Sequence, residues 1–91
     1  MYKIKLSGRF KKSYKKCIKR GLERSSLEYV IKLLVNGEVL PKKYKNHQLS
    51  GNYEGCMECH ISPNWLLIWK YNDDELTLYL IDTGTHSDLF E

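Results

Sequence analysis

This sequence lacks the features that mark membrane-spanning, exported or disulfide-bonded proteins. No apolar run approaches the roughly 20 residues that a membrane-spanning helix needs. The residues from Met1 to Lys5 alternate between apolar and basic side chains and contain no continuous apolar region of the signal-peptide kind. The three cysteines are an odd number, which agrees with a reducing compartment and with no disulfide framework. We therefore expect a cytoplasmic protein that does not contact a membrane.

Acidic residues are nearly missing from the start of the chain, and basic residues from its second half. From Met1 to Arg24 there are ten Lys or Arg residues and one acid, whereas from Gly51 to Glu91 there are eight acids and one base. A basic segment can bind phosphates by counterion release, while a solvated helix face is the alternative interpretation. The lysines that we expect to contact RNA are Lys11, Lys12, Lys15 and Lys16.

The sequence also contains no internal repeat, low-complexity stretch or linker. A chain of 91 residues is long enough for one modest core and too short for two. We therefore expect a single domain spanning residues 1–91.

The first half of the chain has the pattern of one strand followed by two helices. Apolar residues alternate with lysines in the segment 2–6, as in a half-buried strand. Ser7 can cap a first helix, and Gly21 can end it in the left-handed conformation. The segment from Ser25 to Glu28 has capping-box spacing and is expected to start a second helix, which Asn36-Gly37 ends.

The second half is expected to hold a long ordered loop and then at least three strands. The loop runs from Pro41 to Gly55, and Leu40 and Leu49 anchor it. The strands are expected at 56–61, where Cys59 and His60 point to opposite faces, at 65–71, which is apolar on both faces, and at 75–83. This order predicts an α+β fold with an N-terminal strand, a two-helix hairpin and a three- or four-stranded, mostly antiparallel sheet.

One motif in the expected strand at 56–61 matches covalent haem attachment by accident. Cys56, Cys59 and His60 have C-x-x-C-H spacing. Residues three apart on a strand point to opposite faces, so the two cysteines could not hold one haem. A structural zinc site needs four ligands, which this segment does not supply. We expect no metal, one buried cysteine and one partly exposed cysteine.

The three histidines suggest a different chemistry. His47, His60 and His86 all lie in or beside turns of the second half, where loops gather at one end of a sheet. A pair of histidines can deprotonate the 2′-hydroxyl of RNA and protonate the leaving 5′-oxygen without a metal. Trp65 and Phe90 are candidates for stacking nucleobases. Core packing is the alternative for both rings, and for Trp65 the sequence does not separate the two.

Three blocks containing these residues resemble the YafQ family, a branch of the RelE/ParE-like toxins of type II toxin–antitoxin systems. The blocks are His47 to Gly51, Glu58 to Trp69, and Thr83 to Phe90. The terminal Gly-Thr-His-Ser-Asp-Leu-Phe is the most specific part. The resemblance covers nearly the whole chain, including the opening strand, the lysine-rich helix and the helical hairpin.

This resemblance implies a ribosome-dependent mRNA endonuclease, or mRNA interferase, that acts in the ribosomal A site. It implies attack of the 2′-hydroxyl on the adjacent phosphate, no cofactor, and a DinJ-like antitoxin as partner besides the ribosome and mRNA. The family's functional positions fall on His47, His60, Trp65, His86 and Phe90, with His86 as the main general acid or base.

Two positions depart from the family pattern. Asn64 stands where many members carry an aspartate, so we keep it only as a candidate RNA contact. Asp82 stands where many carry an arginine that would stabilise the charged transition state. We expect Asp82 either to orient His86 or to act as a base.

Two other functions share this fold. One is a catalytically weakened module that binds the ribosome or the antitoxin, which Asn64 and Asp82 favour. The other is the gyrase poisoning of the related ParE branch, which is not expected to need a set of histidines.

Overall fold

The computed structural model describes residues 1–90, and within them five strands form one sheet in the order β1-β5-β4-β3-β2. β1 runs parallel to β5, and all other neighbours are antiparallel. The predicted α+β fold with a mostly antiparallel sheet is confirmed. The strands are β1 (Lys3–Leu6), β2 (His47–Gln48), β3 (Met57–Ser62), β4 (Trp65–Asn72) and β5 (Thr77–Gly84).

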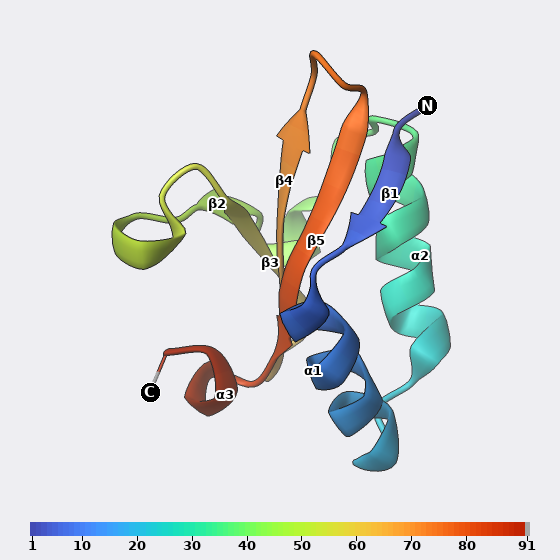
Figure 1. The fold of residues 1–91 in the computed structure, drawn as a ribbon. Coiled ribbons are helices and arrows are strands. Elements are labelled where there is room, and N and C mark those ends of the chain that lie inside the picture. Colours follow the sequence, from blue (N-terminus) through green and yellow to red (C-terminus); the bar gives the residue numbers. More distant parts are fainter. Residues whose placement is uncertain (91) are drawn as a thin grey trace.

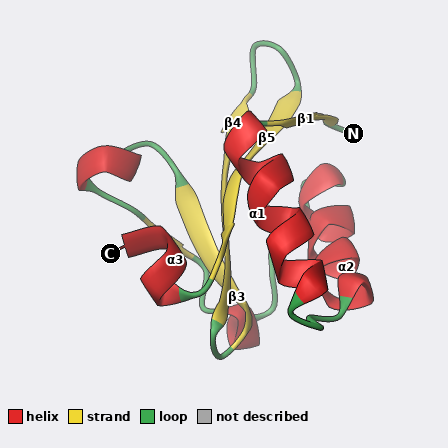
Figure 2. Cartoon of the chain, turned by 60° about the horizontal axis from the view of Figure 1, so that its bottom comes forward, coloured by secondary structure: helices red, strands yellow, loops and turns green. Residues whose placement is uncertain are grey.

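Helices lie on both sides of this sheet. The helical hairpin of α1 (Gly8–Lys19) and α2 (Arg24–Val35) covers one face, and the short α3 (His86–Phe90) lies on the other side (Figures 1 and 2). The loop between α2 and β3 contains two 3-10 turns, η1 (Lys42–Tyr44) and η2 (Gly51–Tyr53). None of the helices formed by residues 1–90 is long and apolar enough to span a membrane.

The ends of α1 follow the sequence pattern, but the start of α2 does not. Ser7 Oγ accepts a hydrogen bond from the Phe10 amide at 2.9 Å, and Gly21 turns the chain with a φ of +91°. The capping-box prediction at Ser25 is wrong because α2 begins at Arg24 and has Glu23 at its N-cap, without a side-chain cap bond. The half-buried Leu22 packs on the core directly after Gly21, so the chain re-enters a helix earlier than the capping pattern suggested.

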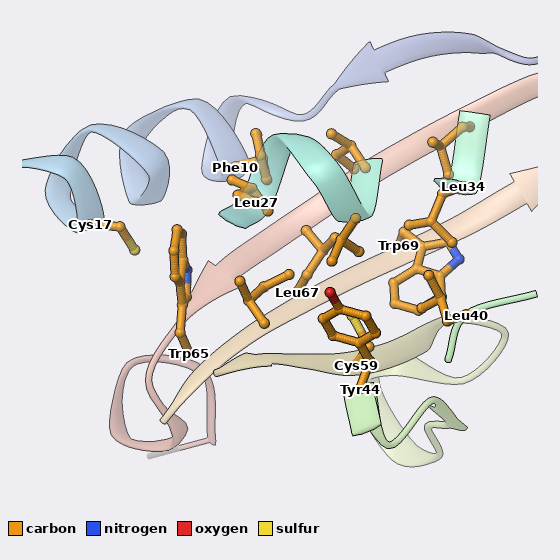
Figure 3. Packing of buried hydrophobic residues seen from close by; sticks show 14 residues of the cluster. Phe10, Cys17, Leu27, Leu34, Leu40, Tyr44, Cys59, Trp65, Leu67 and Trp69 are labelled. Atoms are coloured by element: carbon orange, nitrogen blue, oxygen red, sulfur yellow. The ribbon is translucent and has the colours of Figure 1, made fainter. Parts of the chain in front are cut away.

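The larger part of the core lies between the helical hairpin and the sheet (Figure 3). A smaller cluster on the other face joins β4 to α3 and consists of Cys56, Leu66, Ile68 and Leu89. β4 contributes to both clusters, which confirms the prediction of a central strand that is apolar on both faces. Full burial of such side chains contributes about 1.5–3 kcal/mol each, so β4 is the best anchored strand.

Two details of the strand predictions are wrong. All four residues of β1 are exposed, including Ile4 at 45% and Leu6 at 43%, because β1 is an edge strand with only one neighbour. The strand predicted at 75–83 begins later than expected: β5 starts at Thr77, and Leu76 lies in the turn before it with a φ of +49° and is 56% exposed.

Candidate active site

The three histidines form a row of neighbouring rings on the side of the sheet that carries α3. His60 is the middle member, with its ring centroid 6.4 Å from that of His47 and 5.7 Å from that of His86. The rings come from β2, β3 and α3, and the three histidines are 13 or more positions apart in the sequence. The fold therefore brings together the three side chains that the sequence singled out.

Strand alternation places His60, and a glycine places His86. Cys59 and Ile61 point into the core beneath the helical hairpin, so His60 between them faces the opposite side. Gly84, with a φ of +154°, lets the chain leave β5 and fold back as α3. A Cβ atom at Gly84 would lie 2.8 Å from Asp88 Oδ2, so the turn that positions His86 requires glycine.

An ion pair and a cap fix α3 against the rest of the molecule. Arg20, at the end of α1, donates to both carboxylate oxygens of Asp88, at 2.6 and 3.1 Å. The Thr85 amide donates to Asp88 Oδ2, and the Asp88 amide donates to Thr85 Oγ1. These donors, Arg20 first, hold the pKa of Asp88 well below its usual range. Sequence reasoning missed both this short helix and its clamp.

His47 differs from the other two histidines because both of its ring nitrogens face oxygen acceptors. Nδ1 lies 2.9 Å from the carbonyl oxygen of Lys45, and Nε2 lies 3.1 Å from Glu58 Oε1. A ring with both nitrogens protonated satisfies both contacts with N–H donors. Its carboxylate partner is deeply buried, with a Glu58 side chain that is only 4% exposed.

Glu58 is the site residue that the sequence analysis overlooked. Its second oxygen, Oε2, is buried and has no hydrogen-bond partner within residues 1–90. Glu58 pairs with His47 across the β2–β3 ladder and lies two positions before His60 on the same face of β3. That i, i+2 spacing, with an acid and a histidine on one face of a strand, was the available signal.

The two aromatic candidates have different environments. Phe90 is 48% exposed, and its ring lies 6.4 Å from His86 and edge-on to Tyr53 at 5.8 Å, so it is open to a nucleobase. Trp65 is only 2% exposed, and its indole nitrogen donates to Thr83 Oγ1 at 2.8 Å. Figure 3 shows Trp65 inside the core. The stacking prediction for Trp65 is therefore wrong, because the ring is needed to fill the space beneath α1.

Asp82 does not take the role expected for it. Its carboxylate is buried, with the residue 4% exposed, and accepts a hydrogen bond from the Thr83 amide at 2.8 Å. Within residues 1–90, no hydrogen bond or ion pair joins it to His86, because Gly84 and α3 carry His86 away from β5 toward His60. Asp82 therefore neither orients His86 nor lies open to a substrate.

The remaining RNA-contact candidates are exposed but lie in different places. Asn64 occupies the β3–β4 turn, four residues after His60. The four lysines lie on α1, across the sheet from α3 (Figure 2), so they are not part of the histidine row. All four are exposed: Lys11, Lys12, Lys15 and Lys16.

The cysteines contribute no reactive group to this surface. Cys56 and Cys59 belong to the clusters on opposite faces, as expected, but both are buried, so the prediction of one partly exposed cysteine is wrong. Burial raises the pKa of the Cys59 thiol to about 12, and the charge of Glu58 adds to the shift. No group of three or more His, Cys, Asp or Glu side chains in residues 1–90 is arranged to hold a metal ion.

Comparisons with known proteins show the family of this chain. The family model described as the bacterial toxin of type II toxin–antitoxin systems, YafQ, matches residues 2–91. The mRNA interferase toxin YafQ of Escherichia coli K12 is 39% identical over 88 residues, which cover 96% of this chain and 94% of that protein.

Solved structures share the whole fold. The chain superposes on the crystal structure of the E. coli DinJ–YafQ complex with a TM-score of 0.91 and 37% identity, covering 100% of both chains. A metal-bound toxin from Helicobacter pylori gives a TM-score of 0.93 and 37% identity over 99% of this chain and 100% of that one. With a family model that spans nearly its full length, this chain belongs to the YafQ family of toxins of type II toxin–antitoxin systems.

Proposed function

We propose that this protein is an mRNA interferase that cuts mRNA on the translating ribosome. The observation that carries the proposal is the row of three histidine rings beside the half-exposed Phe90. The E. coli relative with 39% identity is named as an mRNA interferase, which supports the same activity here.

His60 and His86 are the acid–base pair in this mechanism. One imidazole takes the proton of a ribose 2′-hydroxyl, and the 2′-oxygen attacks the adjacent phosphorus. The other imidazolium gives a proton to the departing 5′-oxygen, which leaves a 2′,3′-cyclic phosphate and a 5′-hydroxyl. Each proton transfer contributes about 10²–10⁴-fold to the rate. The two rings are only 5.7 Å apart, so we assign the acid and base roles to the pair and not to either histidine alone.

His47 supplies the positive charge that the transition state needs. Its two nitrogens face the Lys45 carbonyl and the Glu58 carboxylate, so both nitrogens would donate hydrogen bonds when the ring carries two protons beside His60. A fixed cation near the phosphorus stabilises the extra negative charge that develops there. His47 thereby replaces the arginine that many family members carry at the position of Asp82.

A DinJ-like antitoxin is the proposed protein partner, besides the ribosome and mRNA. The support is the similarity over the whole chain to the toxin of the E. coli DinJ–YafQ complex. Phe90, His47 and His86 are exposed and His60 is half-buried, so an antitoxin can inhibit by covering them.

Translation of a defined mRNA in vitro, with cleavage mapped by primer extension, tests the proposed function. Wild-type protein is expected to cut only when ribosomes are present, and His86→Ala is expected to lower the cleavage rate at least 10²-fold. Ser87→Ala is the matched control, because it alters the next exposed residue of α3 and leaves the rings in place. A His86→Ala protein as active as wild type would overturn the assignment.

Because the H. pylori relative was solved with a bound metal, the cleavage assay needs one further control for metal dependence. Protein passed over a chelating resin before the assay is expected to cut at the same sites and rate, because the described residues offer no three-ligand site. Activity that is lost on chelation and restored by added copper or zinc would contradict the metal-free mechanism.

A ribosome-binding module without nuclease activity is the second candidate. It is favoured by Asp82, which puts a buried acid where many family members carry an arginine. Wild-type protein that is folded and sediments with ribosomes, yet yields no cut in the mRNA, would support this function over the first.

A further inference from the structure

A hollow of about 660 Å³ opens beside the histidine row. Its walls come from the first half of α2, from η1 with the residue that follows it, and from the β3–β4 hairpin. His60 belongs both to this wall and to the row of rings, so the hollow adjoins the proposed active site. Its volume lies within the roughly 300–1,000 Å³ of typical ligand sites.

The chemistry of the wall suits an anion with many hydrogen-bond acceptors. Lys43 and Lys45 supply positive charge, Ser25, Ser26 and Ser62 supply hydroxyl groups, and no carboxylate lines the hollow within residues 1–90. Neither lysine forms an ion pair with another described residue. Lys43 Nζ lies 5.1 Å from the ring centroid of Tyr44, which also lines the hollow. The two charges are therefore available to a ligand.

The wall also offers an aromatic surface. Tyr29 of α2 is 52% exposed, although a large aromatic side chain on a helix next to the core is more often packed. An exposed ring beside lysines is the combination that binds single-stranded nucleic acid, because bases stack on the ring while the lysines contact phosphates.

Lys45 connects the hollow to the proposed chemistry. Its backbone has a φ of +50°, which is uncommon for a residue with a side chain, and its carbonyl oxygen faces His47 Nδ1 at 2.9 Å. The same residue thus lines the hollow and holds the ring of His47.

We propose that this hollow binds the RNA strand that flanks the scissile phosphate, with Lys43 and Lys45 on its phosphates and Tyr29 against one of its bases. This inference rests on the proposed nuclease function and deepens it by assigning a substrate-binding surface apart from the lysines of α1. An acidic peptide would also meet the two lysines, but it would leave the exposed Tyr29 ring without a base to stack on.

Binding of a fluorescein-labelled single-stranded oligoribonucleotide with 2′-O-methyl groups, followed by anisotropy over a range of salt concentrations, tests the proposal. The methyl groups remove the nucleophile, so binding is measured without cleavage. The Lys43→Gln/Lys45→Gln protein is expected to bind at least tenfold more weakly, with a log–log salt slope shallower by about 1.4, or roughly 0.7 for each lost phosphate contact. Tyr29→Ala is expected to weaken binding at least fivefold without changing the slope.

The charge-matched control is Lys32→Gln/Lys42→Gln, which removes two exposed lysines of α2 and η1 that do not line the hollow. It is expected to change the affinity less than twofold. Thermal unfolding of each variant checks that the fold is intact.

Equal weakening by the control pair and by Lys43→Gln/Lys45→Gln would overturn the proposal, and so would an absence of oligonucleotide binding by the wild type. Intact RNA binding with reduced binding of the antitoxin would assign the hollow to a protein partner and overturn it too. If wild-type protein binds RNA through the hollow yet never cuts mRNA, the nuclease function fails and the binding site stands.

Discussion

At the scale of single residues, the surroundings of His47 favour a role in supplying positive charge over a role in proton transfer. Its ring nitrogens face the Lys45 carbonyl and the Glu58 carboxylate, so neither is free to exchange a proton with a substrate. If His47 contributes only positive charge, His47→Lys should retain at least tenfold more activity than His47→Gln, because lysine keeps the charge. Single-turnover cleavage rates at saturating ribosome concentration measure this difference.

His86→Lys is the matched control, because a lysine there supplies charge but not the proton transfers proposed for His86. That variant is expected to be as inactive as His86→Ala. Equal rates for His47→Lys and His47→Gln would contradict the proposal that His47 contributes positive charge.

At the scale of elements, α3 is a small helix held in place by the contacts of Asp88 and by the buried Leu89. Asp88 accepts from Arg20 and Thr85, and its pKa is held below the usual range. A lowered carboxyl pKa stabilises the folded state above the unfolded value of about 3.9, and this contribution is lost as the pH falls below it. The docking of α3, and with it the position of His86, is therefore expected to weaken below about pH 4.

Hydrogen exchange of the Leu89 amide, which donates to the Thr85 carbonyl, measures this docking. Its protection factor is expected to fall between pH 5 and pH 3 while that of β4 is kept. Asp88→Asn should show the loss already at pH 7 and lower the cleavage rate, with little change in the free energy of unfolding because the ion pair is partly exposed. A Leu89 amide that stays protected in Asp88→Asn would contradict the clamp.

The elements that could be predicted from the sequence are those fixed by local periodicity. β3 and β4 alternate or run apolar over six to eight residues, so their place in the sheet and the direction of His60 followed from the pattern. α3 could not be predicted in this way, because five residues carry no helical period and because two of its contacts come from distant residues. Asp88 binds Arg20, 68 positions away, and Leu89 packs in the cluster of Leu66 and Ile68.

The site shows the same limit. The histidines could be chosen from the sequence because their acid–base chemistry is specific. A tryptophan, in contrast, is common both in protein cores and on surfaces that stack nucleobases. Only the 2% exposure of Trp65 in the structure assigns it to the core. The prediction that Asp82 orients His86 was wrong for a similar reason. The two residues are close in the sequence, but the turn at Gly84 directs His86 toward His60.

At the scale of the whole molecule, the sheet lies between two surfaces, for which we expect different functions: catalysis on one and ribosome docking on the other. The histidine row lies on the α3 side, and the lysines of α1 lie across the sheet from it (Figure 2). Exposed lysines contact phosphates without regard to sequence, so this face suits docking on ribosomal RNA rather than chemistry. Replacing all four by glutamine should therefore change affinity for the ribosome and leave the chemical step intact. The four are Lys11, Lys12, Lys15 and Lys16.

Cleavage rates over a series of ribosome concentrations and two salt concentrations separate these effects. The quadruple variant is expected to need at least fivefold more ribosomes for half-maximal rate, to reach the wild-type rate at saturation, and to lose part of its salt sensitivity. The Lys43→Gln/Lys45→Gln protein is the informative comparison, because its lost contacts lie at the substrate and not at the docking face. A quadruple variant with a low rate even at saturating ribosomes would show that the two surfaces do not divide the work in this way.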